Sequence, residues 1–187
     1  MNAFAALKYD GSVVTWGKSN AGGDLSQNLL GDSLTSGVVH IYANPWGFNA
    51  LKEDGSLVCW PSWGGEAAIL DQLDGSGSPI KHIYAHQYAH VILKEDGTVL
   101  MYANQLTSAE WGQNNNTGVD LTDIKEISVG QYSFVALKNN GSVVGWGDTS
   151  NELLNIPSSS VTGIVKVYCN GNAYAAIKDD GSVIAWG

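Results

Sequence analysis

Three histidines spaced four residues apart, His82, His86 and His90, form the cluster in this sequence that could most directly do chemistry. On a helix, this spacing would place the three imidazoles on one face, where they could bind zinc. An internal repeat, described below, instead places His82 in a strand, His86 at its end and His90 in a column of aromatic residues. Alternation along the strand and the turn after it would separate the rings. Because His40 aligns with His82 in a neighbouring repeat, we predict packed, hydrogen-bonded histidines and no metal site.

Acidic pairs that precede a glycine, such as Glu95-Asp96 and Asp179-Asp180, are the second group with ligand chemistry. A calcium loop needs several oxygen ligands at defined spacing, and only the Asp-Gly step matches one, so we interpret these pairs as turns. The two cysteines, Cys59 and Cys169, are too few for a disulfide framework and have no obvious activating base. No nucleophile triad or phosphate loop is present in the sequence pattern. We therefore predict that the chain is not an enzyme and takes no cofactor.

The elements that must position any site are copies of one short unit. Five segments align without gaps, with their turn glycines 40 to 44 residues apart. Each copy opens on an aromatic ring or a histidine, runs through an aliphatic residue and a lysine to Asp-Gly or Asn-Gly, and closes on Trp or Tyr. These dipeptides between apolar runs strongly indicate a β-hairpin, because both residues tolerate positive φ. The predicted hairpins are residues 4–17, 48–61, 90–103, 134–147 and 174–187.

A third strand precedes four of the five hairpins. We predict these strands at residues 38–43, 80–85, 124–129 and 164–169. They are apolar on both faces near their ends, which is typical of a strand covered from both sides. The linkers between units are rich in Gly, Ser, Asn and Asp, so we expect loops there and little helix. The first hairpin lacks a preceding strand.

The composition limits the classes of function. Apolar residues make up 44% of the 187 residues and charged residues 14%, which argues against disorder, and 23 glycines with few prolines favour strands and tight turns. The net charge of −9 disfavours binding to nucleic acid and to anionic membranes. There is no signal-peptide pattern and no apolar run long enough to span a bilayer. We expect a soluble protein located in the cytoplasm.

The repeated phrase reads aromatic-x-x-Leu-Lys-x-Asp-Gly-Ser-Val-x-x-Trp-Gly, and residues 134–147 and 174–187 are its clearest copies. It resembles the repeat of the regulator of chromosome condensation (RCC1) family, and the spacing is closest to the compact bacterial branch that includes β-lactamase inhibitor protein II. The resemblance implies an all-β fold, a β-propeller of about five RCC1-like blades, in a single domain over residues 1–187. Three arrangements stay open: a small closed ring, a ring shared between two chains as a homodimer, or a truncation.

The turn that joins each preceding strand to its hairpin varies in the way that binding requires. Rings or an amide occupy its central position, with further amides and a histidine beside it, and all these turns should emerge on one face of the propeller. Rigid aromatic rings with adaptable amides are typical of protein-binding faces. The predicted binding residues are Trp46, Tyr88, Tyr132, Asn172, Asn44, His86, Gln87 and Gln131. The tryptophans that close the hairpins, Trp16, Trp60, Trp146 and Trp186, are predicted to lie in the core.

We therefore predict a non-enzymatic propeller that binds another protein, as an adaptor or an inhibitor. In the β-lactamase inhibitor relative the partner also docks on a propeller face through aromatic residues, which supports this hypothesis by resemblance only. The alternative is a lectin-like propeller that binds a glycan, since exposed rings beside amides suit sugars. Nucleotide exchange on a small GTPase, the activity of the founding family member, is a third hypothesis, and no loop in the sequence marks it.

Overall fold

The computed structural model describes residues 3–25, 32–44, 47–60, 77–85, 89–103, 118–131, 133–147, 155–157 and 162–187. The chain divides into two compact units, which are described separately. Unit 1 comprises residues 1–79 and 85–87, and unit 2 comprises residues 80–84 and 88–187. In the described residues the only helical element is one 3-10 turn, Ser19–Ala21. No helix in these ranges is long and apolar enough to cross a membrane.

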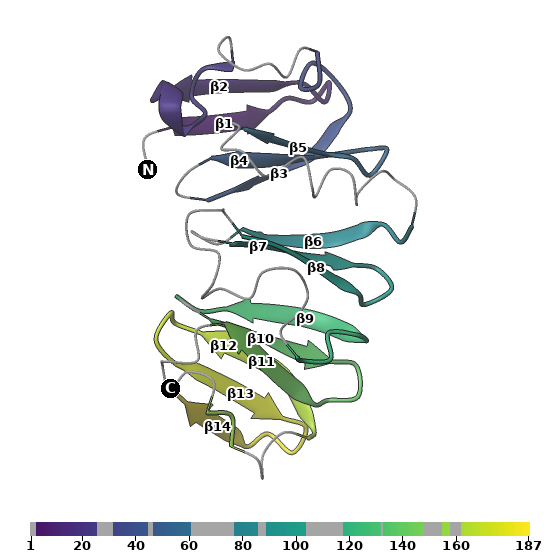
Figure 1. Ribbon diagram of the computed structural model, residues 1–187, viewed down its shortest axis with the longest axis vertical. Helices are drawn as coiled ribbons and strands as arrows, with labels where there is room; N and C mark the ends of the chain where they lie inside the picture. The colour runs from purple at the N-terminus through teal and green to yellow at the C-terminus, as the bar shows by residue number, and fades with distance from the viewer. Residues whose placement is uncertain are drawn as a thin grey trace. The chain divides into compact units, whose positions relative to one another are not determined.

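Unit 1 contains two sheets whose strands follow chain order (Figure 1). The first is a hairpin of β1 (Ala3–Leu7) and β2 (Val13–Gly17). The second has three strands, β3 (Val38–Ala43), β4 (Phe48–Lys52) and β5 (Leu57–Trp60), paired antiparallel. The predicted hairpins at residues 4–17 and 48–61 are confirmed to within one residue at each end.

Unit 2 contains three sheets of three strands each, again in chain order (Figure 1). The first contains β6 (Ile80–Ala85), β7 (Ala89–Lys94) and β8 (Val99–Ala103). The second contains β9 (Ile124–Val129), β10 (Ser133–Lys138) and β11 (Val143–Gly147). The third contains β12 (Ile164–Cys169), β13 (Tyr174–Lys178) and β14 (Val183–Trp186). The first strand of each three-stranded sheet, in both units, has the bounds predicted from the sequence.

The Asp-Gly and Asn-Gly steps form the hairpin turns for a specific reason. In the last hairpin, Asp180 Oδ1 accepts hydrogen bonds from the backbone N–H of Ser182 at 2.8 Å and from its hydroxyl at 2.6 Å. The same pair of bonds recurs in every hairpin, with Asn140 Oδ1 as the acceptor in the fourth. The glycine that follows has positive φ in each turn. The acidic side chains at these positions thus serve the turn, as predicted.

These bonds make the stability of the hairpins dependent on pH. The hydroxyl and backbone N–H of Ser182 hold the pKa of Asp180 below its ordinary value, and Asp10, Asp54 and Asp96 are lowered in the same way. A lowered folded-state pKa means that the stabilisation is complete above the ordinary carboxyl value of about 4 and is lost as pH falls through the lowered value. We expect urea unfolding to show falling stability below about pH 4. Asp180→Asn, which copies the natural Asn140 turn, should make this fall shallower without changing stability at pH 7. An unchanged slope in that variant would contradict the assignment.

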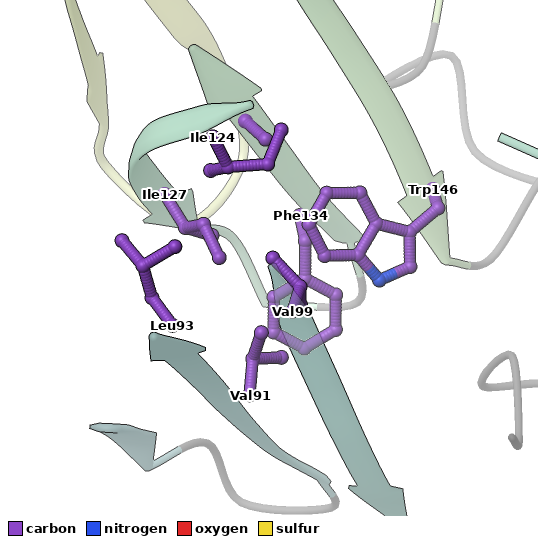
Figure 2. Close-up of a cluster of buried hydrophobic side chains, with 8 residues drawn as sticks. Val91, Leu93, Val99, Ile124, Ile127, Phe134 and Trp146 are labelled. Carbon is purple, nitrogen blue, oxygen red and sulfur yellow. The ribbon is translucent and has the colours of Figure 1, made fainter. Parts of the chain in front are cut away.

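Each sheet has two faces of different composition. We call the face that carries the aromatic and tryptophan columns the ring face, and the opposite face the aliphatic face. In unit 2, Val91, Leu93 and Val99 on the aliphatic face of β7 and β8 pack against Phe134 and Trp146 on the ring face of β10 and β11 (Figure 2). Between the second and third sheets of unit 2, the aliphatic face of β10 and β11 packs in the same way on Tyr174 and Trp186. In unit 1, Val13 of the hairpin packs against Trp60.

The hairpin turn of one sheet also holds the first strand of the next. The carbonyl of Gly97 accepts the backbone N–H of Ile124 at 2.9 Å, and the carbonyl of Gly141 accepts that of Ile164 at 2.9 Å. A Cβ on Gly97 would lie 2.9 Å from the Ile124 nitrogen, so this glycine is needed both for its positive φ and for the close approach. In unit 1 Gly11 and Val38 make the same contact at 3.0 Å.

Burial differs from the sequence prediction in two places. The strand covered along its whole length is the middle strand β10, whereas the first strands β3 and β12 each have three exposed residues, two of them consecutive. The middle strand is flanked by strands in its own sheet and by a sheet on each face, which its sequence pattern alone did not reveal. The prediction that Trp16 lies in the core is wrong: its side chain is 52% exposed, while Trp60, Trp146 and Trp186 are buried as predicted. In the part of unit 1 that the structure describes, no sheet covers the ring face of β1 and β2.

Candidate binding surface

The predicted binding turns join the first and middle strands of each three-stranded sheet. Trp46, Tyr88, Tyr132, His86 and Gln87 lie outside the described residues. Asn44 lies in the turn between β3 and β4, Gln131 between β9 and β10, and Asn172 between β12 and β13. Gln131 and Asn172 belong to unit 2 and are exposed, and Asn44 belongs to unit 1 and is half-buried.

An asparagine at the first position of the turn closes it. In unit 1 the backbone N–H of Asn44 donates to the carbonyl of Gly47 at 3.0 Å, and the N–H of Gly47 donates to Asn44 Oδ1 at 2.8 Å. In unit 2 Asn170 Oδ1 accepts the backbone N–H groups of Asn172 at 3.0 Å and of Ala173 at 2.9 Å. Such Asx turns pin the turn backbone with a side chain. Asn44 therefore shapes its turn, and Asn170 does the same work in the last sheet.

The turn between β9 and β10 has glycine at this position for a steric reason. The backbone N–H of Gly130 still donates to the carbonyl of Ser133 at 2.8 Å, so the turn is closed like the turns that begin at Asn44 and Asn170. A Cβ on Gly130 would lie 2.6 Å from Tyr174 Oη. Tyr174 is fully buried, and its hydroxyl donates to the carbonyl of Ser133 at 2.9 Å and lies 3.0 Å from the Ser133 hydroxyl. Burial raises the pKa of Tyr174, so the phenol stays protonated and keeps donating.

Two neighbouring turns of unit 2 are joined directly. The backbone N–H of Gln131 donates to the carbonyl of Gly171 at 2.9 Å. Together with the Tyr174–Ser133 bonds, this contact fixes the turn of one sheet against the turn of the next. The exposed side chains Gln131, Asn170 and Asn172 thus share one surface, which we call the amide surface.

The amide surface offers hydrogen-bonding groups. Primary amides donate and accept hydrogen bonds, and they do not titrate or act as nucleophiles at ordinary pH. Cys169, just before the turn, is a free thiol that accepts the backbone N–H of Gly171 at 3.2 Å. Cys59 likewise takes part in no disulfide. In the described ranges, no group of three or more His, Cys, Asp and Glu side chains is placed to hold a metal ion.

Two of the histidines are exposed and contact a tyrosine on their own strand. His40 on β3 lies 4.3 Å from Tyr42, and His82 on β6 lies 4.5 Å from Tyr84, both measured between ring centroids. The two pairs occupy equivalent places in their sheets. His90 is on β7, in a different strand from His82, and His86 lies outside the described residues.

Sequence reasoning missed two residues that shape this surface. Asn170 aligns with Asn44, so the repeat register could have identified it as a turn-closing residue. Gly130 carried no such signal, because its requirement comes from Tyr174, a residue of the next sheet.

Comparison with known proteins supports the family resemblance. The family model described as "Regulator of chromosome condensation (RCC1) repeat" matches residues 124–152, which contain the second sheet of unit 2. No curated protein sequence is significantly similar to the chain. The RCC1-repeat resemblance is thus confirmed, and the likeness to the bacterial branch stays a prediction.

Solved structures show the fold. Prp20p from Saccharomyces cerevisiae, in a study of its binding to Gsp1p and histones, is 18% identical with a TM-score of 0.60, over 98% of this chain and 55% of that chain. Yeast RCC1 (Prp20) bound to Kap60 is 16% identical with a TM-score of 0.61, and the match covers 98% of this chain and 53% of that chain. The CRINKLY WD40 ectodomain of the Arabidopsis thaliana receptor kinase ACR4 is 20% identical with a TM-score of 0.55. This match covers 99% of this chain and 67% of that chain. The fold is therefore that of RCC1-type β-propeller blades, and the chain spans about half the length of the yeast structures.

Proposed function

We propose that this chain of RCC1-type blades is a non-enzymatic module that binds another protein through the turns between first and middle strands. The observation that carries the proposal is the direct bond from Gln131 to Gly171, which makes two turns of unit 2 one fixed surface. A surface held in place before binding loses little conformational entropy when a partner docks, and this favours affinity. An adaptor or inhibitor role follows from such a module.

The sequence supplies the anchors for this surface. Trp46, Tyr88 and Tyr132 align with Asn172 at the centre of the four turns. Trp and Tyr are the residues that most often dominate protein-binding energy, and amides around them adapt their hydrogen bonds to the partner. We infer that each ring is the anchor of its own turn, with Tyr88 and Tyr132 in unit 2 and Trp46 in unit 1.

The similar structures also support a protein partner. One study reports the structure of Prp20p and its binding properties to Gsp1p and histones, and the other reports Kap60 bound to yeast RCC1, so the partners named are proteins. Since this chain spans about half of Prp20p and is under 20% identical to it, we propose only the class of partner and not these partners.

The test is partner capture by the immobilised chain. Replacing Trp46, Tyr88 and Tyr132 together with alanine should abolish capture of proteins from a native lysate, because each anchor can contribute about 2 kcal/mol or more. The double change Gln131→Ala and Asn172→Ala should weaken capture by a smaller factor. Tyr9→Ala and Tyr168→Ala remove exposed rings outside these turns and serve as matched controls.

Capture that survives the triple change, in a protein whose unfolding curve matches the wild type, would show that the proposed face is wrong. A glycan array run in parallel separates the lectin-like alternative. Specific glycan binding that is lost in the triple variant, without protein capture by the wild type, would replace the protein-binding proposal.

A further inference from the structure

The charged residues of this chain are segregated from the turns that carry the predicted binding residues. The four turns between first and middle strands, residues 44–47, 86–89, 130–133 and 170–173, contain no Asp, Glu, Lys or Arg. By contrast, each of the five hairpin turns begins with a lysine, and four of the five also contain an acidic residue. The net charge of −9 is therefore carried by other parts of the chain.

The last sheet of unit 2 shows how far apart the two kinds of turn lie. Asn172 is in the turn before β13, and Asp179 is in the hairpin turn after it. The five residues of β13, at about 3.3 Å each, separate the two turns by roughly 15 Å. Exposed charges that lie further apart than the Debye length, about 8 Å at physiological salt, are largely screened. The hairpin charges therefore contribute little to the electric field at the amide surface.

One charged pair lies nearer to the amide surface, and its two charges offset each other. Lys166 on β12 donates to Glu126 Oε2 on β9 at 2.7 Å. Both are the third of six residues in strands that end at the amide surface. Among the described residues of unit 2, the turns at that surface and the nearer halves of the strands carry no Asp, Glu, Lys or Arg. The amide surface is thus polar without being charged.

We propose that the partner presents an uncharged, hydrogen-bonding patch to the amide surface, made of peptide groups and of amide or hydroxyl side chains. This inference rests on the proposed function and specifies its partner. Depletion of charge is typical of the centre of a protein–protein interface. The primary amides of Gln131, Asn170 and Asn172 offer donors and acceptors that match a peptide group. A charged group on the partner would lose its hydration here without an opposite charge to compensate, so such a patch is disfavoured.

A charge of either sign at Asn172 tests the proposal. Asn172 is exposed, and Asn170 Oδ1 closes the turn by accepting backbone N–H groups, so the Asn172 side chain can change without opening the turn. The probe is the purified protein that the wild type captures and the triple ring variant does not. Asn172→Asp and Asn172→Lys should each raise the Kd for this protein by about tenfold or more, because either charge is buried unpaired. Asn172→Ala should raise it less.

Matched controls change the charge of the same sheet away from the amide surface. Asp179→Asn and Asp179→Lys alter the exposed hairpin turn at the other end of β13 and should leave the Kd unchanged. The wild type supplies a test that needs no substitution. Its Kd should change by less than about twofold between about 0.05 and 0.5 M NaCl, because salt screens only charged contacts. Circular dichroism and urea unfolding report whether each variant is folded.

Three results would overturn this inference while the proposed function stands. Opposite effects of Asn172→Asp and Asn172→Lys would show a charged patch on the partner. A wild-type Kd that rises by about tenfold or more with salt would show the same. Unchanged binding in both variants would show that the partner does not cover the amide surface. A chain that captures no protein, or captures it equally well after the triple ring change, contradicts the proposed function itself, and the inference falls with it.

Discussion

Replacing Trp146 with alanine is expected to lower the free energy of unfolding of unit 2 by about 3–5 kcal/mol, the range for truncating a large buried aromatic side chain. Trp146 is 3% exposed and packs with Phe134, Val91 and Val99. Alanine would leave a cavity between two sheets that cannot close without moving both. Urea unfolding followed by tyrosine fluorescence and by circular dichroism measures the change.

The same chain supplies the matched control for this substitution. Trp16 occupies the equivalent position in the first hairpin, stacks on Phe4 in the same way, and is 52% exposed. Trp16→Ala should lower the free energy of unfolding by about 1 kcal/mol, because the exposed ring buries little apolar area when the protein folds. Equal losses at the two sites would contradict the assignment of buried and open ring faces.

The second large effect concerns the fit between Gly130 and Tyr174. Gly130→Ala should lower the stability of unit 2 by about 1–3 kcal/mol, since it overpacks a site where the new Cβ would lie 2.6 Å from Tyr174 Oη. Tyr174→Phe alone should cost about 1 kcal/mol, the value of the lost bond to Ser133. In the double variant the phenol oxygen that clashes is gone. The two losses should therefore sum to more than the measured loss of the double variant, by about 1 kcal/mol.

A control cycle distinguishes this coupling from a general weakening of unit 2. Val91 lies in the other hydrophobic cluster of the unit, which contains neither Gly130 nor Tyr174. Gly130→Ala and Val91→Ala should be additive. Additive losses in the Gly130–Tyr174 cycle as well would show that the turn moves away from the clash, and the amide surface would then not be fixed by the core.

The strands and turns could be predicted from the sequence because their causes are local. Asp180, Gly181 and Ser182 contain both the acceptor and the donors of the last turn, and apolar columns repeat with the period of a strand. Burial could not be read in the same way. Trp16 and Trp146 occupy the same position of the repeat, each two residues after a valine and just before a glycine, and the presence of a covering sheet separates them.

In the candidate site, too, the features with local causes could be predicted and those that depend on distant residues could not. The repeat register predicted where Asn44, Gln131 and Asn172 lie, because those positions follow from strand length. The sequence did not reveal that Gly171 accepts the Gln131 N–H, since this bond joins turns 40 residues apart in the chain. The need for glycine at position 130 likewise arises from the hydroxyl of a distant tyrosine.

The bond from a hairpin glycine to the next first strand, which three of the hairpins make, has a consequence for how such chains change in length. The contacts Gly11–Val38, Gly97–Ile124 and Gly141–Ile164 are of one kind, and so are the faces that meet beside them. Duplication or loss of one whole repeat, from any hairpin to the equivalent point of the next, would create a junction chemically equivalent to the existing ones. A gene of this design can therefore gain or lose blades by recombination without needing any new interface.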